Sequence, residues 1–208
     1  MKKEIQIEVP KNWSAITLRQ YIELQKDLKA YEGESEALLA AMFYHLCGVT
    51  PEIMRKLDTE TFLNIKAELE GFISQTDLPL VRSFDYDGIR YGIYPNLSKI
   101  EYGAYIDISK LVTKEMGEDW AKAMAILYRP ITKQKGKLYS VANYTGEEEW
   151  EWFLDLGMDI HWGAYYFFFY LSMELLSAIP NSMMKMVEET LPNIKSILEE
   201  NGLTIPQS

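Results

Sequence analysis

Cysteine and histidine, the residues behind most nucleophilic and zinc chemistry, are scarce in this chain. Its 208 residues include one cysteine, Cys47, and two histidines, His45 and His161. A single thiol excludes an intrachain disulfide, and with it the disulfide-rich secreted class. Cys47 lies two positions after His45 in a segment with helical character, where such neighbours point to different sides and cannot act on each other. We therefore expect an inert thiol and two core or helix-end histidines.

Short catalytic and cofactor motifs are also missing. The chain contains no G-x-S-x-G, H-E-x-x-H, paired C-x-x-C, P-loop or G-x-G-x-x-G pattern. A hydrolase nucleophile elbow, a zinc site and a nucleotide site therefore have no support in the sequence. The sequence predicts a protein that binds without catalysis, cofactor or metal. An enzyme with a carboxylate-only site is the alternative, and it would need at least two acids that converge in a pocket.

Positive charge and long apolar runs are in short supply. Lysine and arginine number 21 against 31 aspartates and glutamates, so the net charge of -10 opposes binding to nucleic acid. The apolar segment His161 to Pro180 has only 14 positions between Asp159 and Glu174. They span about 21 Å as a helix, well short of the roughly 30 Å of a bilayer core. We expect a buried core helix, with an oligomer interface as the second possibility and no membrane contact.

The start of the chain resembles a strand more than an export signal. Charged residues alternate with Ile5, Ile7 and Val9, which leaves no continuous apolar stretch of signal-peptide length. The alternation predicts a short strand here. A cytoplasmic location, in the cell that makes the protein, is the resulting expectation.

What the sequence has is apolar and aromatic mass with clear helix signals. Hydrophobic residues make up 48% and aromatic residues 13%, and no linker rich in Gly, Ser or Pro divides the chain. We expect a mainly α (α+β) fold, with residues 1–208 as a single compact domain. Capping residues, helical periodicity and prolines predict helices at about Thr17–Ala30, Glu36–Cys47, Pro51–Leu57, Thr59–Ile73 and Gly117–Tyr128, one after Gly157, and a last pair around Pro192.

Two further capping boxes and two hairpins complete the prediction. Ser98 with Glu101, and Thr145 with Glu148, repeat the pattern of Thr17 with Gln20 and predict helix starts. Asp87-Gly88 predicts a type I′ turn between strands near Val81–Tyr86 and Ile89–Tyr94, within a hairpin segment around 80–96. A second hairpin is expected around 130–144, turning at Lys135-Gly136.

Candidate partner-binding residues cluster in two places. Trp150, Trp152 and Phe153 follow a run of glutamates, and the helical spacing separates Trp152 from the other two, so one face is free to anchor a partner. Met183 and Met184 place flexible, polarizable side chains near the C-terminal end, as adaptable binding surfaces do. Both groups have a plain structural alternative, a helix start in solvent and an irregular core.

The stretch AMAILYRPITKQKGKLYSVANY, residues 123–144, resembles small proteins from the tail and morphogenesis regions of tailed bacteriophage genomes. The same resemblance takes in IEYGAYIDISKL at residues 100–111 and LGMDIHWGAYYFFFYLSMELL at residues 156–176. It implies an assembly factor similar to tail assembly chaperones, which bind phage structural or tail proteins in the host cytoplasm without a chemical step.

The resemblance carries only one residue role and leaves two assembly roles open. It implies a partner contact for Arg129, for which bonding to the free carbonyls at a helix end is the structural alternative. The chain is then either a transient assembly factor or a permanent virion component, such as a connector or tail-ring subunit that forms homo-oligomers. A small regulatory or host-directed binding protein is a third possibility.

Overall fold

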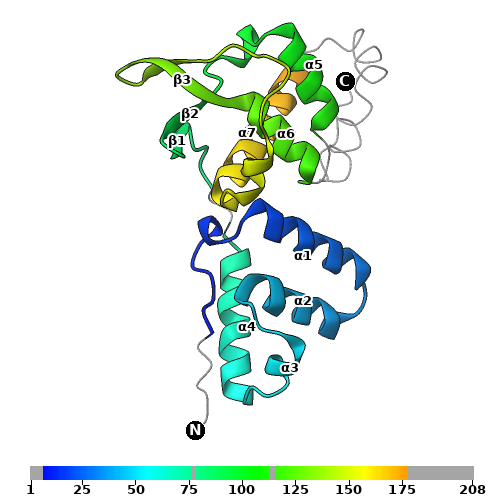
Figure 1. Cartoon of the computed structure of the whole chain (residues 1–208). Coiled ribbons are helices and arrows are strands. Elements are labelled where there is room, and N and C mark those ends of the chain that lie inside the picture. Colours follow the sequence, from blue (N-terminus) through cyan, green and yellow to red (C-terminus); the bar gives the residue numbers. More distant parts are fainter. Residues whose placement is uncertain (1–6, 76–77, 113–115, 178–208) are drawn as a thin grey trace. The chain divides into compact units, whose positions relative to one another are not determined.

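The computed structural model describes residues 7–75, 78–112 and 116–177 (Figure 1). Helices dominate, and four strands form one antiparallel sheet in the order β1-β2-β3-β4, which confirms a mainly helical α+β fold. The chain packs as two compact units. Unit 1 comprises Met1–Pro79 and Leu154–His161, and unit 2 comprises Leu80–Phe153 and Trp162–Ser208.

This division differs from the single domain expected from the absence of a linker. The chain passes between the units three times, after Pro79, Phe153 and His161. The second passage lies inside the 3-10 helix η3 (Glu151–Asp155) and the third inside helix α7 (Met158–Ser177). Because the second and third passages fall within regular structure, they show no linker that a sequence-based prediction could detect.

Unit 1 is helical, and α1, α3 and α4 begin where capping residues predict. Thr17 and Gln20 form the complete capping box, the side chains of Thr50 and Asp58 each accept a backbone N–H, and Gly48 adopts the left-handed conformation. The elements of unit 1 are η1 (Trp13–Ala15), α1 (Leu18–Ala30), α2 (Ser35–Cys47), α3 (Pro51–Met54) and α4 (Thr59–Ile73).

The core of unit 1 is aromatic. Trp13 packs on Phe72 of α4 with ring centroids 4.5 Å apart, and Phe43 of α2 stacks on Phe62 at 5.4 Å. Leu18 and Phe43 are fully buried. These ring contacts join η1 and α2 to α4.

A distant segment returns to close unit 1. The backbone N–H of Leu18 donates to the carbonyl of Leu156 at 3.1 Å, and that of Met158 donates to Ile16 at 2.8 Å. Gly157 sits opposite Thr17 in an isolated antiparallel bridge, where a Cβ would approach the backbone of Ser14 to 2.8 Å. Only glycine fits this crossing, which ties the start of α1 to residues 154–158.

Unit 2 combines the sheet with helices. Its elements are β1 (Ser83–Tyr86), β2 (Ile89–Ile93), η2 (Leu97–Lys99), α5 (Tyr102–Leu111), α6 (Glu118–Leu127), β3 (Tyr128–Lys135), β4 (Leu138–Val141) and the greater part of α7. Both predicted hairpins are present. Asp87 and Gly88 have φ of 46° and 74°, as a type I′ turn requires, and hairpin β3–β4 extends away from the helices (Figure 1).

A glycine contact holds hairpin β3–β4 against β2. The Tyr139 ring lies over Gly92, where an added Cβ would come within 2.6 Å of the ring and 3.0 Å of Ile131. The Tyr139 hydroxyl lies 2.8 and 2.9 Å from the carbonyl oxygens of Ile93 and Arg82, which share its proton. Because Gly92 has no side chain, the Tyr139 ring can lie against β2 and its hydroxyl can hydrogen-bond to the carbonyls of Ile93 and Arg82.

Two of the expected helix starts are wrong, and each has a physical reason. Ser98 lies in η2, and α5 begins at Tyr102 without a side-chain cap because the Glu101 carboxylate pairs with Arg129 instead. Glu148 does accept the backbone N–H of Thr145 at 2.8 Å, but the five-residue 3-10 helix η3 follows in place of an α-helix.

Several predictions fall at or beyond the edges of the described chain. Residues 7–10 have no regular structure, so the N-terminal strand is absent there. The helical pair around Pro192, with Met183 and Met184, lies outside the described residues. In α7, Met158, His161 and Ala164 are fully buried, whereas Tyr166 is 36% exposed, so the described part of the apolar run is only partly a core helix. No helix of the described chain has the length and apolarity needed to cross a membrane.

Candidate functional site: an aromatic pocket in unit 2

Trp152 lies at the centre of an aromatic cluster built from the first hairpin and η3. Its ring stacks on Tyr86 at a centroid distance of 4.2 Å and on Phe153 at 3.9 Å, and it contacts Tyr91 at 4.7 Å. Phe84 stacks in turn on Tyr91 at 5.9 Å. The register explains the grouping, since Phe84 pairs with Tyr91 across the hairpin and Tyr86 follows two positions later on the same face.

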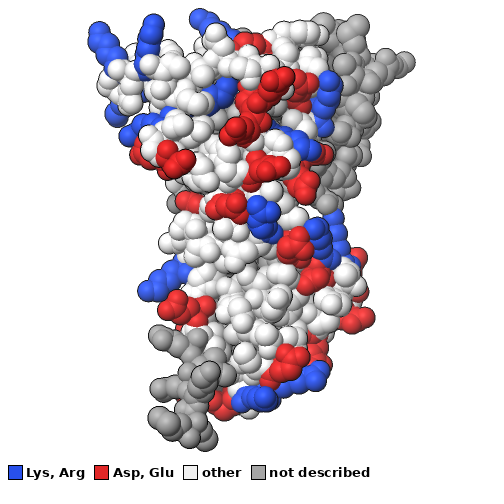
Figure 2. All heavy atoms as spheres, viewed as in Figure 1, with Lys and Arg blue, Asp and Glu red and all other residues white. Residues whose placement is uncertain are grey.

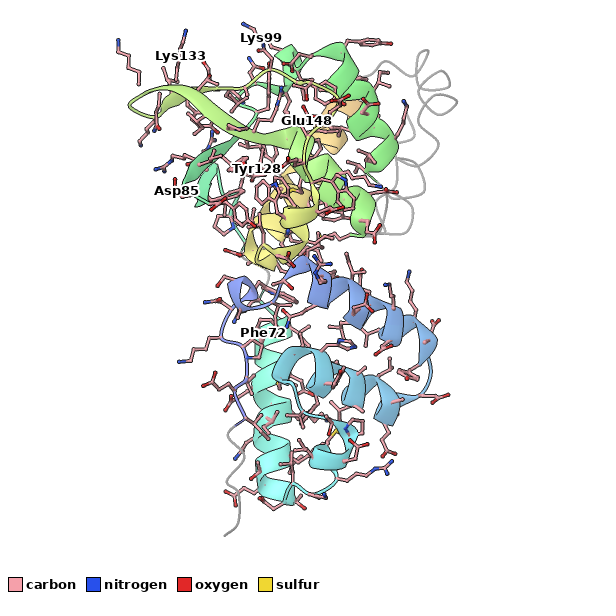
Figure 3. All side chains as sticks on the ribbon, viewed as in Figure 1. Phe72, Asp85, Lys99, Tyr128, Lys133 and Glu148 are labelled. Atoms are coloured by element: carbon pink, nitrogen blue, oxygen red, sulfur yellow. The ribbon has the colours of Figure 1, made fainter. Side chains whose placement is uncertain are left out.

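A pocket of about 240 Å³ opens beside this cluster. Helix α6, strands β2 and β3, the segment 142–149 and η3 form its walls, and every described lining residue belongs to unit 2. Figure 3 labels Tyr128 and Glu148, two of these residues. The described lining consists of Tyr91, Ala125, Tyr128, Arg129, Pro130, Ala142, Asn143, Thr145, Glu148, Glu149, Trp152 and Phe153.

Arg129 forms the most extensive polar network at the pocket. Its side chain is only 2% exposed, and its two Nη atoms donate to the Glu101 carboxylate at 3.1 and 3.0 Å. Nη1 also donates to the Ala142 carbonyl at 3.0 Å, and the guanidinium lies 4.6 Å from the centre of the Tyr94 ring. Hydrogen bonds from Arg129, opposed in part by burial, lower the pKa of Glu101 to about 2. Glu101 is thus ionised at neutral pH.

Two glutamates supply the negative charge of the lining. Glu148 is half-buried, with Oε1 bound to Thr145, whereas Glu149 is exposed. Burial, followed by the charge of Glu149, raises the pKa of the Tyr91 phenol, so the field of Glu149 reaches the aromatic wall. Acidic side chains also gather on the surface of unit 2 in Figure 2. The lining of the pocket therefore combines aromatic rings with two carboxylate side chains.

The candidate binding residues from the sequence are spread over different environments. Trp152 and Phe153 both line the pocket, although Phe153 is 1% exposed and acts mainly as core. Trp150 is half-buried beneath Lys122, whose Nζ lies 5.1 Å from the ring centre. Arg129 also lines the pocket, but a direct partner contact by its paired Nη atoms would require the pair with Glu101 to open.

Sequence reasoning missed most of the pocket. Tyr91 was expected only as a strand residue and Tyr128 only as the end of a helix, whereas Glu148 and Glu149 were expected at a helix start in solvent. One available signal was the type I′ turn, which fixes the register of the first hairpin and places Phe84, Tyr86 and Tyr91 on one face. Nothing local in the sequence joins that face to Trp152, which is 61 positions beyond Tyr91.

Two titratable residues that the sequence singled out, His45 and Cys47, lie in unit 1. His45 Nε2 lies 2.8 Å from Asp27 Oδ2. Burial, with a smaller effect of Glu68, raises the pKa of Cys47 to about 11, so its thiol stays protonated at neutral pH. No cluster of three metal-ligating side chains occurs among the residues that the structure describes.

Comparison with known proteins adds no relative. No protein-family model, curated protein or solved structure matches the chain.

Proposed function

We propose that this protein is a phage-encoded assembly factor that works in the host cytoplasm by binding a tail or virion protein, without a chemical step. The single observation that carries the binding part is the pocket beside Trp152, with aromatic walls and two glutamates. Aromatic anchors in partly desolvated pockets are typical of protein interfaces. The phage part rests on the resemblance of residues 123–144 to phage morphogenesis proteins.

Exposed apolar side chains on unit 2 support the same proposal. Tyr102 of α5 is 79% exposed and Leu138 at the start of β4 is 78% exposed. Tyr105, one turn after Tyr102, is also exposed. Tyrosine is enriched in protein interfaces because its ring and hydroxyl together suit a surface that is alternately wet and buried.

The chemistry of the lining favours binding over catalysis. Among the described residues of the pocket wall there is no histidine, cysteine, serine or lysine. The potential nucleophiles that the lining does contain, which are Thr145, two tyrosines and two glutamates, have no histidine or lysine beside them in the described lining to act as a base. The carboxylate-only enzyme is the second candidate, because Glu148 and Glu149 do line one pocket.

Capture from infected cells tests the proposal. The tagged full-length protein is expressed in a host infected by a tailed phage, and bound proteins are identified by mass spectrometry. We expect to capture a phage tail or virion protein in stoichiometric amount, and we expect the mass of this partner to be the same as before binding. A modified or cleaved partner would support the enzyme instead, and capture of host proteins alone would contradict the assembly role.

Two matched tryptophan variants connect the capture to the pocket. Trp152→Leu removes a pocket wall, whereas Trp150→Leu removes an equally large, half-buried ring that is not in the lining. We expect partner recovery to fall at least about tenfold for Trp152→Leu and to change little for Trp150→Leu. Amide hydrogen exchange on both variants identifies any loss that comes from unfolding.

The fate of the protein separates an assembly factor from a virion component. A transient factor is present in infected cells but absent from purified virions, and alone it is a monomer or loose dimer in light scattering. A connector or tail-ring subunit forms a stable ring and remains in the particle.

A further inference from the structure

We infer that the pocket beside Trp152 receives a lysine or arginine side chain from an extended segment of the partner protein. The inference rests on the proposed function for the identity of the partner as a protein. It names the chemistry of the group that the pocket selects, which the proposed function leaves open.

The charges at the pocket leave a negative excess. The guanidinium of Arg129 is neutralised by its two-point pair with Glu101. Glu148 is bound only through Oε1 to Thr145, and neither Glu148 nor Glu149 forms an ion pair with a described lysine or arginine. Two carboxylate side chains therefore line the pocket without a counter-charge among the described residues, and a cation is the ligand that would balance them.

The walls fit a cation on a long apolar stem. Trp152 and Tyr91 supply aromatic carbon to the lining, although the faces of the Trp152 ring are already stacked on Tyr86 and Phe153. Their apolar surface also suits the methylene stem of a lysine or arginine, which buries its carbon atoms and keeps its charge near polar groups. A volume of about 240 Å³ is larger than one such side chain needs, and leaves room for part of the backbone.

A buried donor in the wall points to that backbone. The Nε–H of Arg129 is buried and finds no acceptor among the described residues. A buried N–H without an acceptor is costly, so a movement of the pocket wall that let a ligand oxygen reach it would be favoured. A peptide supplies a carbonyl oxygen and a basic side chain together, whereas an isolated cation or a free anion satisfies only one of the two features.

The charge of the whole chain favours a different protein over a second copy. A net charge of -10 makes two copies repel each other and attract a basic partner. The competing occupant is nevertheless clear from the sequence of hairpin β3–β4. It exposes Lys133, Lys135 and Lys137 (Figure 3 labels Lys133), which could enter the pocket of a neighbour.

Two small probes with the same backbone measure the selectivity directly. N-acetyl-lysine N′-methylamide and N-acetyl-norleucine N′-methylamide have the same carbonyl groups and stem, but only the first carries a charge. Each is titrated into the ¹⁵N-labelled full-length protein while the indole N–H signal of Trp152, assigned with Trp152→Phe, is followed. We expect the lysine probe to bind about tenfold more tightly. Equal affinities, or no shift with either probe at 50 mM, would overturn the inference.

Paired charge variants separate the pocket from the general acidity of the chain. Glu148→Gln with Glu149→Gln removes two charges from the lining and keeps an oxygen at position 148 for Thr145. Glu147→Gln with Glu151→Gln removes two charges from exposed neighbours that are not in the lining. The first variant should lose the preference for lysine, and the second should retain it. If both variants lost the preference for the lysine probe equally, the preference would come from the general negative charge of the chain, and the proposed pocket would be contradicted.

The same variants distinguish this inference from the proposed function. If Glu148→Gln with Glu149→Gln captures the partner normally and the probes bind equally, the inference fails and the assembly role stands. If the lysine probe is preferred but no phage protein is captured, the cation pocket stands and the assembly role fails. A closed oligomer that dissociates in this variant would place a lysine of a second copy in the pocket and overturn the inference of a different partner.

Discussion

Two arginine–carboxylate pairs in the molecule have the same chemistry and opposite surroundings. In unit 2, Arg129 and Glu101 meet at 3.0 Å, with side chains that are 2% and 37% exposed. In unit 1, Arg19 and Asp155 meet at 2.9 Å, with side chains that are 55% and 56% exposed. Both are two-point contacts. Their geometry alone would rank them as equals.

Burial decides how much each pair can contribute. Water and salt screen the exposed pair, and holding two long side chains in place costs entropy. Arg129 has lost nearly all its water, so its charge depends on Glu101, on the Ala142 carbonyl and on the Tyr94 ring. Unit 2 therefore depends on the ion pair of Arg129 for its stability, whereas the ion pair of Arg19 contributes little to the stability of unit 1.

The largest predicted effect comes from removing the carboxylate of the buried pair. Glu101→Gln leaves the guanidinium of Arg129 buried without a counter-charge, which should cost about 3 kcal/mol of stability in unit 2. The measurement is native-state hydrogen exchange, resolved by mass spectrometry into peptides from each unit. Exchange in unit 1 serves as the internal control and should change little.

Arg129→Met is the matched variant for the same pair. It keeps an apolar stem in the buried space and leaves behind Glu101, which is partly exposed and can be hydrated. We expect a smaller loss of stability than in Glu101→Gln. The reverse order would show that the packing of Arg129, rather than its charge, is what unit 2 depends on.

Acid should weaken the buried pair, with an effect smaller than that of the substitution. The pKa of Glu101 is lowered to about 2 from an ordinary value of 4.5. A lowered folded-state pKa gives stability that is present above the unfolded value and is lost as the pH falls toward the folded value. As the pH falls from about 5 to about 2, the free energy of unfolding measured in urea should therefore decrease more for the wild type than for Glu101→Gln. Parallel pH curves for the two proteins would contradict this.

Two glycine substitutions extend the comparison from charge to packing. Gly92→Ala places a methyl group 2.6 Å from the Tyr139 ring in unit 2, and we expect it to cost about 1–3 kcal/mol. Gly71→Ala, within α4 of unit 1, meets no atom within 4 Å and should stabilise its helix by about 0.5–1 kcal/mol. Hydrogen exchange in each unit measures both, and a neutral Gly92→Ala would show that Tyr139 shifts freely.

The difference between local signals and distant contacts explains which elements could be predicted from the sequence. The helices of unit 1 and both hairpins of unit 2 depend on local signals, such as the cap at Thr17 and the turn at Asp87-Gly88, and these were confirmed. The helix start expected at Ser98 was wrong because Glu101 serves a residue 28 positions away. A capping pattern cannot reveal that its acidic residue has a stronger use elsewhere in the fold.

The candidate site depends on the same kind of distant contact. Trp152 was expected to be a binding residue because it is a tryptophan and because helical spacing separates it from Trp150 and Phe153. It does line the pocket. Its neighbours Tyr86 and Tyr91 come from a hairpin more than 60 positions earlier, and only the folded chain brings them together. Arg129 was noticed for the turn in which it lies, whereas its pair with Glu101 required the fold.

The smallest predicted effect concerns the exposed pair, and it is the sharpest test of the comparison. A double-mutant cycle with Arg19→Gln and Asp155→Asn should give a coupling energy of about 0.2–1 kcal/mol in unit 1. Because the pair is screened, 1 M salt should reduce this coupling markedly, whereas the cost of Glu101→Gln should change little with salt. The cycle is measured by hydrogen exchange in unit 1, where the pair links α1 to the returning segment. A coupling near 3 kcal/mol would contradict the argument from burial, because it would give the exposed pair the strength expected only of the buried one.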